Sequence, residues 1–494
     1  MKPTQLFLAT LLLCATAQAQ DLKVYFGNLH SHTSYSDGSG TPDEAYKHAR
    51  DVAGLDFLAV TEHNHKSAKS KIADSPELYN GNSAISLKSY ANSYTKNGEF
   101  VAIYGQEFSS ISSGNHGNVL EADAVIQTTD VPNGEWDKLL TTWLPAHKDS
   151  RGKDAILFLT HPATSSSPNA IEYGIDDFPT QAEWLASLDQ YAQLMNIING
   201  PSHQGTNPAK PSESEFKRYL NMGLHVAPTA DQDNHRRDWG SVADTRTAVI
   251  APSLDKASIL DALASRHVYA TQDKNLEIVA TINGKLIGSI LSDDQLPSVG
   301  SELTISISIN DSDEPMAYYT VDVYADKPGG AEQADVIKEE RFSGNGTFNI
   351  SGVKYAGGSQ YFYIKVIQTD DDAEVFDMAW LAPVWFEPST AAPATAATHV
   401  TLSVNPRTEV ATITNIGSQE VDLKKWKLVS TVGDQQFEFP AWKLKPGESV
   451  DVVSGSQAAA SSTAILWKKQ YIWNNDADPG ELYDKNGQLV ASTN

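Results

Sequence analysis

The chain has 494 residues, with 37 lysines and arginines against 62 aspartates and glutamates, so its formal net charge is −25. This excess of negative charge argues against broad, sequence-independent nucleic-acid binding and disfavours docking on anionic lipid, because both depend on basic surfaces. A hydrophobic content of 40% excludes a disordered chain, and the length suggests about two to four domains.

The first 19 residues have the features of a secretory signal peptide. Lys2 is followed by an apolar run from Leu6 to Ala15 and by the small-residue ending Ala17-Gln-Ala19, which predicts cleavage after Ala19. The only cysteine, Cys14, lies inside this segment, so we expect no disulfide in the mature chain. No later stretch has about 18 consecutive apolar residues, so we expect no membrane span. The sequence therefore predicts a soluble, exported protein, either periplasmic or extracellular.

Residues 20–274 alternate between short apolar runs and amphipathic stretches, which is typical of an α/β domain. Buried strands are expected at Val24–Leu29, Phe57–Val60, Phe100–Tyr104, Ile156–Leu159, Leu194–Ile198 and His225–Pro228. Helices are expected after Thr41 and after Ser253, each acting as an N-cap. This alternation predicts a parallel sheet or barrel with helices outside it.

The remaining chain has all-β patterning in two parts. Residues 275–387 alternate in period two, which predicts a β-sandwich, and they carry 19 acidic and 6 basic residues. Residues 388–397 form a Pro/Ala/Thr linker, and residues 398–494 form a second all-β domain. The predicted fold class is therefore multidomain, α/β plus all-β.

Histidines and carboxylates follow five of the predicted strands in the first domain. They include His30-x-His32 after the first strand, Glu62-His63 after the second, and Asp231-x-Asp233-x-His235 after the last. In a parallel barrel the carboxyl ends of the strands meet at one face, so we expect these side chains to lie together. Imidazole and carboxylate are the usual ligands of Zn, Mn and Fe, and the absence of a thiol excludes a thiolate-bound structural zinc.

These motifs, taken in order, resemble those of the PHP (polymerase and histidinol phosphatase) superfamily, over about residues 22–272. The resemblance implies a distorted (βα)₇ barrel, a site for two or three divalent metal ions (Zn, Mn or Fe), and phosphoesterase activity. By position it implies that the metal-ligating and catalytic residues are His30, His32, Asp37, His63, Glu107, His116, His161, Asp233 and His235. Glu62 stands where many members have aspartate, so we expect it to support a ligand rather than to bind metal. Asp231 is a rival to Asp233, but only Asp233 has the Asp-x-His spacing.

A phosphoryl site also requires positive charge for the non-bridging oxygens. Arg236 and Arg237 directly follow the last ligand motif and are the candidate substrate-binding residues, together with His203. The alternative for the arginine pair is a solvated basic turn. The acidic clusters 311–314 and 370–372 lack EF-hand spacing, so we expect solvated loops there rather than calcium sites.

Residues 398–494 resemble a lamin-tail domain. The similarity lies in segments such as Ala411–Gly417, Val421–Leu428, Leu444–Gly447 and Tyr471–Trp473, and it implies an immunoglobulin-like sandwich. In an exported protein such a domain suggests a partner on a surface or in the surrounding matrix. Its tryptophans are expected to lie in the core rather than to form a ligand platform.

The leading hypothesis is an exported metal-dependent phosphoesterase that hydrolyses small phosphate esters or nucleotides through metal-bound hydroxide. An extracellular nuclease or phosphodiesterase is the second reading, with nucleic acid as a less favoured partner. A secreted adhesion or matrix-binding protein that holds metal without turnover is a third, and a hydrolase of amides or carboxylic esters is a fourth. The sequence has neither a Gly-x-x-x-x-Gly-Lys phosphate loop nor a Gly-x-Ser-x-Gly elbow, which favours direct attack by water over a covalent serine route.

Overall fold

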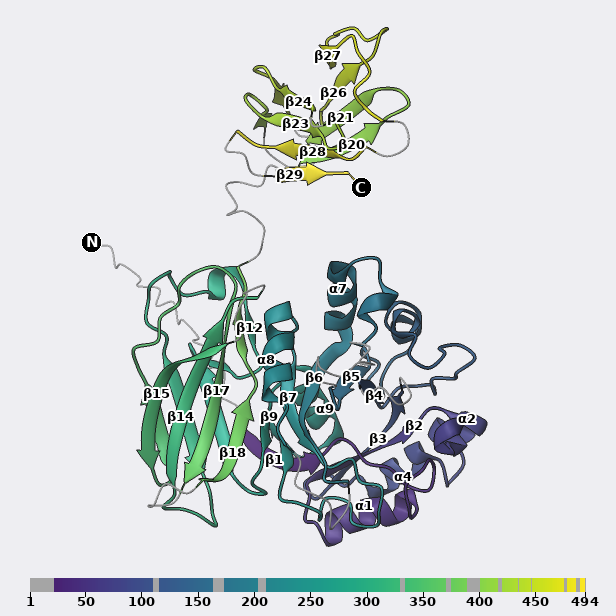
Figure 1. Cartoon of the computed structure of the whole chain (residues 1–494), viewed down its shortest axis with the longest axis vertical. Helices are drawn as coiled ribbons and strands as arrows, with labels where there is room; N and C mark the ends of the chain where they lie inside the picture. Colours follow the sequence, from purple (N-terminus) through teal and green to yellow (C-terminus); the bar gives the residue numbers. More distant parts are fainter. Residues whose placement is uncertain are drawn as a thin grey trace, which may run out of the picture. The chain divides into compact units, whose positions relative to one another are not determined.

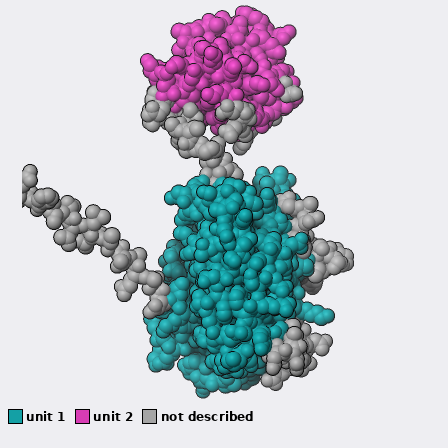
Figure 2. All heavy atoms as spheres, turned by 90° about the vertical axis from the view of Figure 1, so that its left-hand side faces the viewer, with its two compact units in different colours: residues 1–388 teal, residues 389–494 magenta. Residues whose placement is uncertain are grey.

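The computed structural model describes residues 22–109, 115–162, 173–202, 210–328, 334–369, 375–388, 400–415, 420–433, 435–445, 447–474, 478–485 and 489–493. The chain divides into two compact units, residues 1–388 and 389–494 (Figure 2). The predicted signal peptide of residues 1–19 lies outside the described residues, as does the predicted linker apart from Pro388.

The first part of unit 1 contains the strands and helices that surround the candidate site (Figure 1). Its strands are β1 (Lys23–Asn28), β2 (Phe57–His63), β3 (Val101–Phe108), β4 (His116–Leu120), β5 (Ile156–Thr160), β6 (Ala192–Asn199), β7 (Ala227–Asp231), β8 (Arg246–Ala251) and β9 (Val268–Thr271). Its helices are α1 (Pro42–Asp51), α2 (Lys71–Asp74), α3 (Glu77–Asn80), α4 (Leu87–Tyr94), α5 (Trp136–Lys138), α6 (Leu144–Ala146), α7 (Gln181–Tyr191), α8 (Glu213–Met222) and α9 (Lys256–Ala264). Short helical turns lie at η1 (Lys66–Ala68), η2 (Leu139–Trp143) and η3 (Ile175–Asp177).

These strands form one curled, mixed sheet in the order β9-β8-β1-β2-β3-β4-β5-β6-β7. The neighbours are parallel in β1–β2, β2–β3, β5–β6 and β6–β7, whereas β4 runs antiparallel to both β3 and β5. The chain beyond β7 returns to the chain beyond β1, where Ser31 and Asn234 form a parallel bridge. This return brings the loops after the first and the last of these parallel strands into contact.

A regular (βα)₇ barrel is not shown by these pairings, and the distorted barrel stays a prediction. β4 follows β3 without an intervening helix, and β8 and β9 are antiparallel additions beside β1. The six predicted strands are all present, but β4, β8 and β9 were not predicted. All three pair antiparallel with their neighbours, whereas the strand–helix alternation of the sequence predicts parallel strands.

Local sequence explains where the helices begin. The Thr41 side chain accepts the Glu44 N–H, and the Glu44 side chain accepts the Thr41 N–H, which completes a capping box with Pro42 in the first turn. The predicted cap at Ser253 is wrong, because α9 is capped by Asp255, whose side chain accepts the Ser258 N–H. Ser253 instead donates its hydroxyl to Asp255.

The second part of unit 1 is β-rich and continues the same sheet. Its elements are β10 (Glu277–Ile282), β11 (Lys285–Leu286), β12 (Ile290–Leu291), η4 (Asp293–Gln295), β13 (Ile305–Asn310), β14 (Tyr318–Asp326), β15 (Asp335–Ser343), β16 (Gly346–Ile350), β17 (Gln360–Thr369), β18 (Val375–Leu381) and β19 (Val384–Phe386). Strands β11-β10-β13-β16 form a separate sheet, while β18 pairs with β9. One hydrophobic core runs from Leu29 and Phe57 to Ile278, Ile305 and Ile364, so the two parts are packed together. The predicted division at residues 274/275 stays a prediction within this unit.

Unit 2 is a two-sheet sandwich. Its strands are β20 (Val400–Asn405), β21 (Val410–Asn415), β22 (Val421–Asp422), β23 (Lys427–Ser430), β24 (Gln435–Glu438), β25 (Lys443–Leu444), β26 (Ser449–Ser454), β27 (Ala464–Lys468), β28 (Gly480–Tyr483) and β29 (Leu489–Ser492). The sheets β20-β21-β26-β27 and β24-β23-β28-β29 enclose a core in which Trp426 and Trp473 are buried. Among the described residues of both units, no helix has the length and apolar character needed to cross a membrane.

Candidate metal centre

The nine predicted ligands all lie at one edge of the curled sheet. His30 and His32 follow β1, His63 ends β2, Glu107 lies near the end of β3, and His161 follows β5. His116 begins β4, and because β4 is antiparallel to β3 and β5, its first residue reaches the same edge as their last residues. Asp233 and His235 follow β7, and Asp37 comes from the loop between β1 and α1. Strand order therefore gathers side chains that are far apart in the sequence.

Glu107 lies at the centre of the deep half of the site. Its Oε1 atom is 3.0 Å from His116 Nδ1 and 2.9 Å from His161 Nε2. Its Oε2 atom is 3.4 Å from His30 Nε2, 3.3 Å from His32 Nε2 and 3.0 Å from His63 Nδ1. One buried carboxylate thus contacts five imidazoles, a grouping that few purely structural roles require.

Two triangles of donor atoms share the edge between His30 and His32. The two Nε2 atoms are 3.2 Å apart. In the first triangle, Asp233 Oδ1 lies 3.4 Å from His30 Nε2 and 3.3 Å from His32 Nε2. In the second triangle, Glu107 Oε2 lies 3.4 Å from His30 Nε2 and 3.3 Å from His32 Nε2. Ligands at about 2.0–2.1 Å around a tetrahedral zinc are separated by about 3.3–3.4 Å. Each triangle therefore has the dimensions of one face of a tetrahedral metal site.

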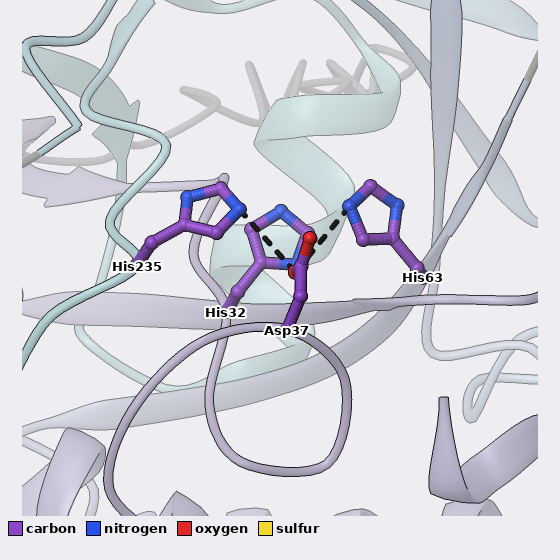
Figure 3. A group of neighbouring side chains, drawn as sticks. All are labelled: His32, Asp37, His63 and His235. Carbon is purple, nitrogen blue, oxygen red and sulfur yellow. Dashed lines mark ion pairs between the residues drawn. The ribbon is translucent and has the colours of Figure 1, made fainter. Parts of the chain in front are cut away.

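The shallow half of the site is a four-residue group (Figure 3). Asp37 lies between His63 and His235, with its Oδ1 atom 3.6 Å and 3.4 Å from their Nε2 atoms. His32 stacks on both imidazoles, with ring centroids 4.5 Å from His63 and 4.4 Å from His235. Donor atoms of these four residues lie within 4.8 Å of one another, as do those of His30-His32-Asp233 and His30-Glu107-His161.

The buried donors of this site fit divalent cations. Among the described residues, Glu107 Oε2, Asp233 Oδ1 and His63 Nδ1 are buried and make no hydrogen bond of good geometry; they meet other site residues only in ion-pair contacts, such as the 3.0 Å contact between Glu107 Oε2 and His63 Nδ1. Leaving such atoms unpaired is costly unless something else binds them. Because nitrogen and carboxylate oxygen converge here without thiols, the donor set suits Zn, Mn or Fe. The three overlapping groups together hold eight residues, more donors than one tetrahedral ion takes, which fits two or three ions rather than one.

The electrostatics of the cluster also favour a bound positive charge. Burial alone would raise the pKa of Glu107, but His30, His63 and His116 hold it well below its usual range. Burial lowers the pKa of His63 to about 3, so that imidazole is neutral and able to bind a metal at neutral pH. Burial would also lower the pKa of His32, yet Asp233 and Glu107 raise it well above its usual range. Asp233 and Glu107 thus stabilise a positive charge on His32. A bound metal ion would replace that proton and supply the positive charge instead.

Burial varies across the site in a way that defines an open side. The side chains of His30 and His32 are 0% exposed, and that of Glu107 is 1% exposed. Asp37 is 35% exposed and His235 is 28% exposed. The site is therefore open to solvent on the side of Asp37 and His235.

Glu62 supports the loop that carries Asp37, as the sequence predicted. Its carboxylate accepts hydrogen bonds from the Thr33 N–H at 2.9 Å and from the hydroxyls of Thr33 and Ser36. Ser36 Oγ is in turn 3.3 Å from Nδ1 of His32. Glu62 is fully buried and belongs to none of the donor groups, so it positions the loop and the imidazole rather than joining the ligands.

Asp231 and Asp233 have different surroundings. The oxygens of Asp231 are occupied by protein donors, namely the Leu29 N–H, the Asn196 side-chain amide and the Thr247 hydroxyl. Asp233 instead faces the imidazoles and adopts a left-handed backbone with φ of 50°, a conformation that non-glycine residues adopt rarely and often at functional sites. The geometry agrees with the choice of Asp233 as the ligand.

Asn199 is a functional candidate that the sequence reasoning missed. Its Oδ1 atom lies 3.3 Å from His30 Nδ1, and its Nδ2 atom donates to Asp233 Oδ2 at 3.2 Å. It therefore orients two candidate ligands from the end of β6. An asparagine at a strand end has no distinctive spacing, and only its place at the same edge as the histidines would have marked it.

The predicted substrate-binding residues lie less centrally. Arg236 and Arg237 are exposed, and Arg237 Nη1 pairs with Glu44 Oε1 at 2.6 Å near the start of α1. His203 lies outside the described residues. Substrate binding by these three residues stays a prediction.

Comparison with known proteins identifies unit 2 and leaves the rest of the chain without a family. Residues 393–494 match the family model of the Lamin Tail Domain, which confirms that resemblance. Curated proteins give no significant sequence match.

Among solved structures, the chain is similar to a two-domain protein from Bacteroides vulgatus ATCC 8482 that contains a predicted PHP-like metal-dependent phosphoesterase. The identity is 14%, the match covers 72% of this chain and 95% of that one, and the TM-score is 0.37. The periplasmic chaperone SfaE matches at 11% identity over 43% of this chain and 96% of its own, with a TM-score of 0.15. The E. coli chaperone DraB matches at 13% identity over 44% and 96%, with a TM-score of 0.16. These similarities are too distant to assign a fold or an activity.

Proposed function

We propose that this protein is an exported metal-dependent phosphoesterase that hydrolyses small phosphate esters or nucleotides. The main support for the proposal is the two triangles of donor atoms that both include His30 and His32. Next to them lies the group of His32, Asp37, His63 and His235, which is exposed to solvent at Asp37. A purely structural metal site is usually closed and has about four ligands. An extended donor set with an exposed side is the arrangement expected where a substrate must reach the metals.

The proposed ligands are the nine residues predicted from the sequence, and each histidine would bind one ion through one ring nitrogen. When bound, divalent ions would polarise a phosphoryl oxygen and lower the pKa of water, which supplies a nucleophile at neutral pH. The chain's own residues hold the donors in place. Asn199 orients His30 and Asp233, and Glu62 holds the loop that carries Asp37.

The exposed arginines after His235 would meet the non-bridging oxygens of a phosphate. Arg236 has this role in the proposal, because Arg237 is already paired with Glu44. An anionic polymer is a less favoured substrate, since residues 275–387 carry 19 acidic against 6 basic residues and belong to the same unit as the site.

One panel of assays tests the proposal. The mature protein is incubated with Mn²⁺, Zn²⁺ or Fe²⁺ and with a phosphomonoester, a phosphodiester, an oligonucleotide and a carboxylic ester. We expect turnover of the monoester or of nucleotides that depends on added metal and is lost in the double variant H30A/H32A. The matched control is His147→Ala, which removes a half-buried histidine that is paired with Asp123 outside the site.

The other readings predict different results. Preferred cleavage of the oligonucleotide or diester would support a nuclease, and hydrolysis of the carboxylic ester alone would support a different hydrolase. Metal binding without turnover of any substrate would contradict the proposal and favour an adhesion or matrix-binding protein. Export is tested separately, by sequencing the N-terminus of the protein recovered outside the cytoplasm, where cleavage after Ala19 is expected.

A further inference from the structure

A second cluster of acidic side chains lies in the β-rich part of unit 1, apart from the histidines. Asp273 follows β9, while Asp311 and Glu314 follow β13, and one carboxylate oxygen from each lies within 4.8 Å of the other two. Asp311 is 0% exposed and Asp273 is 6% exposed. The expectation of a solvated loop at residues 311–314 is therefore wrong for Asp311.

Backbone amides hold two of these carboxylates in fixed orientations. Asp273 Oδ1 accepts the N–H groups of Asn275 at 2.6 Å and of Leu276 at 3.1 Å. Asp311 Oδ1 accepts the N–H groups of two following residues, 313 and 314, each at 3.0 Å. Such turns are common in loops, so they explain the shape of the cluster but do not by themselves indicate a ligand.

Two buried polar side chains on the adjoining sheet provide a separate indication. Tyr319 in β14 and Gln368 in β17 are cross-strand neighbours, so their side chains point to the same face. Gln368 Nε2 donates to Asp311 Oδ2 at 2.8 Å, which places this face against the cluster. Burial raises the pKa of the Tyr319 hydroxyl, and the negative charges of Asp311, Asp273 and Glu314 raise it further, which agrees with its place beside Gln368 on this face.

These side chains leave polar atoms unpaired at the cluster. Among the described residues, Gln368 Oε1 and the Tyr319 hydroxyl have no hydrogen-bond partner, and each residue is only 1% exposed. Leaving a buried amide oxygen or hydroxyl unpaired costs free energy, because the group has lost its hydrogen bonds to water. A ligand that accepts electron pairs from oxygen would remove that cost for both atoms.

We propose that Asp273, Asp311 and Glu314 bind one calcium ion, with Gln368 Oε1 and the Tyr319 hydroxyl as further oxygen donors. Calcium takes six to eight oxygen ligands from carboxylates, amide carbonyls and water, in irregular geometry. The absence of imidazole and thiol from this cluster disfavours zinc and iron. This site is independent of the proposed phosphoesterase, since it shares no residue with the candidate metal centre.

The charges around the cluster fit a divalent ion. Asp377 lies opposite Gln368 in β18 and faces the same way, and Asp244 adds a further negative charge nearby. The cations in the neighbourhood are Arg246, which donates to the backbone oxygens of Ala243 and Thr245, and Lys274, which pairs with Asp313 at 3.2 Å. The neighbouring carboxylates outnumber these two cations, so bound calcium would offset the excess.

The position of the cluster indicates what the ion would do. It joins the ends of β9 and β13 to the face formed by β14 and β17, and so links the two sheets of the β-rich part. Because β9 also belongs to the sheet that carries the candidate metal centre, calcium would stabilise the packing of the two parts of unit 1. We expect a structural rather than a catalytic ion.

The experiment measures Ca²⁺ binding by isothermal titration of the full chain. The expected result is one saturable Ca²⁺ per chain with Kd below about 1 mM, the weak end of protein calcium sites. Calcium at about 100 times Kd should raise the thermal midpoint of unit 1 by about 3–4 °C. Glu314→Gln should weaken binding at least tenfold. Because Glu314 is exposed, the variant should fold like wild type, and circular dichroism without Ca²⁺ checks this.

Two controls make the outcome decisive. Asp313→Asn removes the same charge from the same loop but outside the cluster, so its affinity should stay within about twofold of wild type. H30A/H32A should retain the calcium site, which separates this proposal from the proposed function. No saturable binding below 10 mM Ca²⁺ (about tenfold above the weakest expected Kd), or equal binding by wild type and E314Q, would overturn the proposal and indicate that the carboxyls share a proton instead.

Discussion

Replacing His225 with glutamine should destabilise unit 1 in a way that depends strongly on pH. The imidazole lies between two carboxylates, with Nδ1 at 2.7 Å from Asp189 Oδ2 and Nε2 at 2.8 Å from Glu387 Oε1. Its ring also packs edge-on against Trp385, with the centroids 5.1 Å apart. The histidine thus links the end of α7 to the end of β19.

The size of the destabilisation follows from the shift in the pKa of the His225 imidazole. Burial would lower the pKa of His225, but Asp189 and Glu387 raise it to about 9, compared with 6.5 for an unperturbed histidine. A raised pKa in the folded state stabilises the fold fully below pH 6.5, and this contribution disappears as the pH rises through 9. At 1.36 kcal/mol per pKa unit, the contribution is on the order of 3 kcal/mol at pH 6 and close to zero at pH 10.

The assay is urea unfolding of wild type and His225→Gln between pH 6 and pH 10, followed by tryptophan fluorescence in the same metal-free buffer. Loss of the contact with Trp385 gives a constant difference, whereas loss of the charge gives a difference that shrinks as the pH rises. His147→Gln is the matched control, because that imidazole also pairs with an aspartate, Asp123, at 2.8 Å and packs on a tryptophan, Trp143, but it is more exposed, at 29%, and Asp123 is 55% exposed. Its effect should stay below about 1 kcal/mol. An H225Q penalty that does not change with pH would refute the reasoning.

Three further predictions concern the metal centre and the first helix. Glu107→Gln should lose at least one equivalent of bound divalent metal, because its carboxylate contacts five imidazoles; metal analysis showing wild-type content would contradict this. Asn199→Ala should weaken metal affinity about 10- to 100-fold, because His30 and Asp233 lose the contacts that orient them. Competition with a chromophoric chelator measures this affinity, and an unchanged value would show that the contacts do not orient the ligands. Thr41→Ala should cost about 1 kcal/mol of unfolding free energy through loss of the capping box, as measured by urea unfolding; a cost near zero would mean that packing alone positions α1.

The candidate site was largely predictable because its residues lie next to recognisable strands. Buried runs such as Phe57–Val60 mark strands by their hydrophobicity, and polar residues that follow them at once, such as His63, are expected at the sheet edge. The nine predicted ligands do lie at one edge. Asn199 was missed because its residue type and spacing are ordinary, and its importance comes from touching His30 and Asp233.

The fold was less predictable than the site. Strand β4 reverses direction between β3 and β5, and β8 and β9 extend the sheet on its other side, which the strand–helix alternation did not indicate. The loop that contains Asp311 was expected to be solvated, because a short acidic segment has no pattern that reveals burial by a distant strand. Its burial depends on Gln368 in β17, a contact that no local signal encodes.

The sequence by itself determined which kinds of atoms are available to this protein. Its histidines and carboxylates follow hydrophobic strands, thiols are absent beyond Cys14, and the C-terminal part carries lamin-tail motifs. Only the tertiary structure decided which of these atoms meet. The bridge between Ser31 and Asn234 brings the loops after β1 and β7 together, and the reversal of β4 brings His116 to Glu107. The physical reason is that local patterns encode burial and backbone state, whereas distances between donors depend on strand order, direction and the curl of the whole sheet.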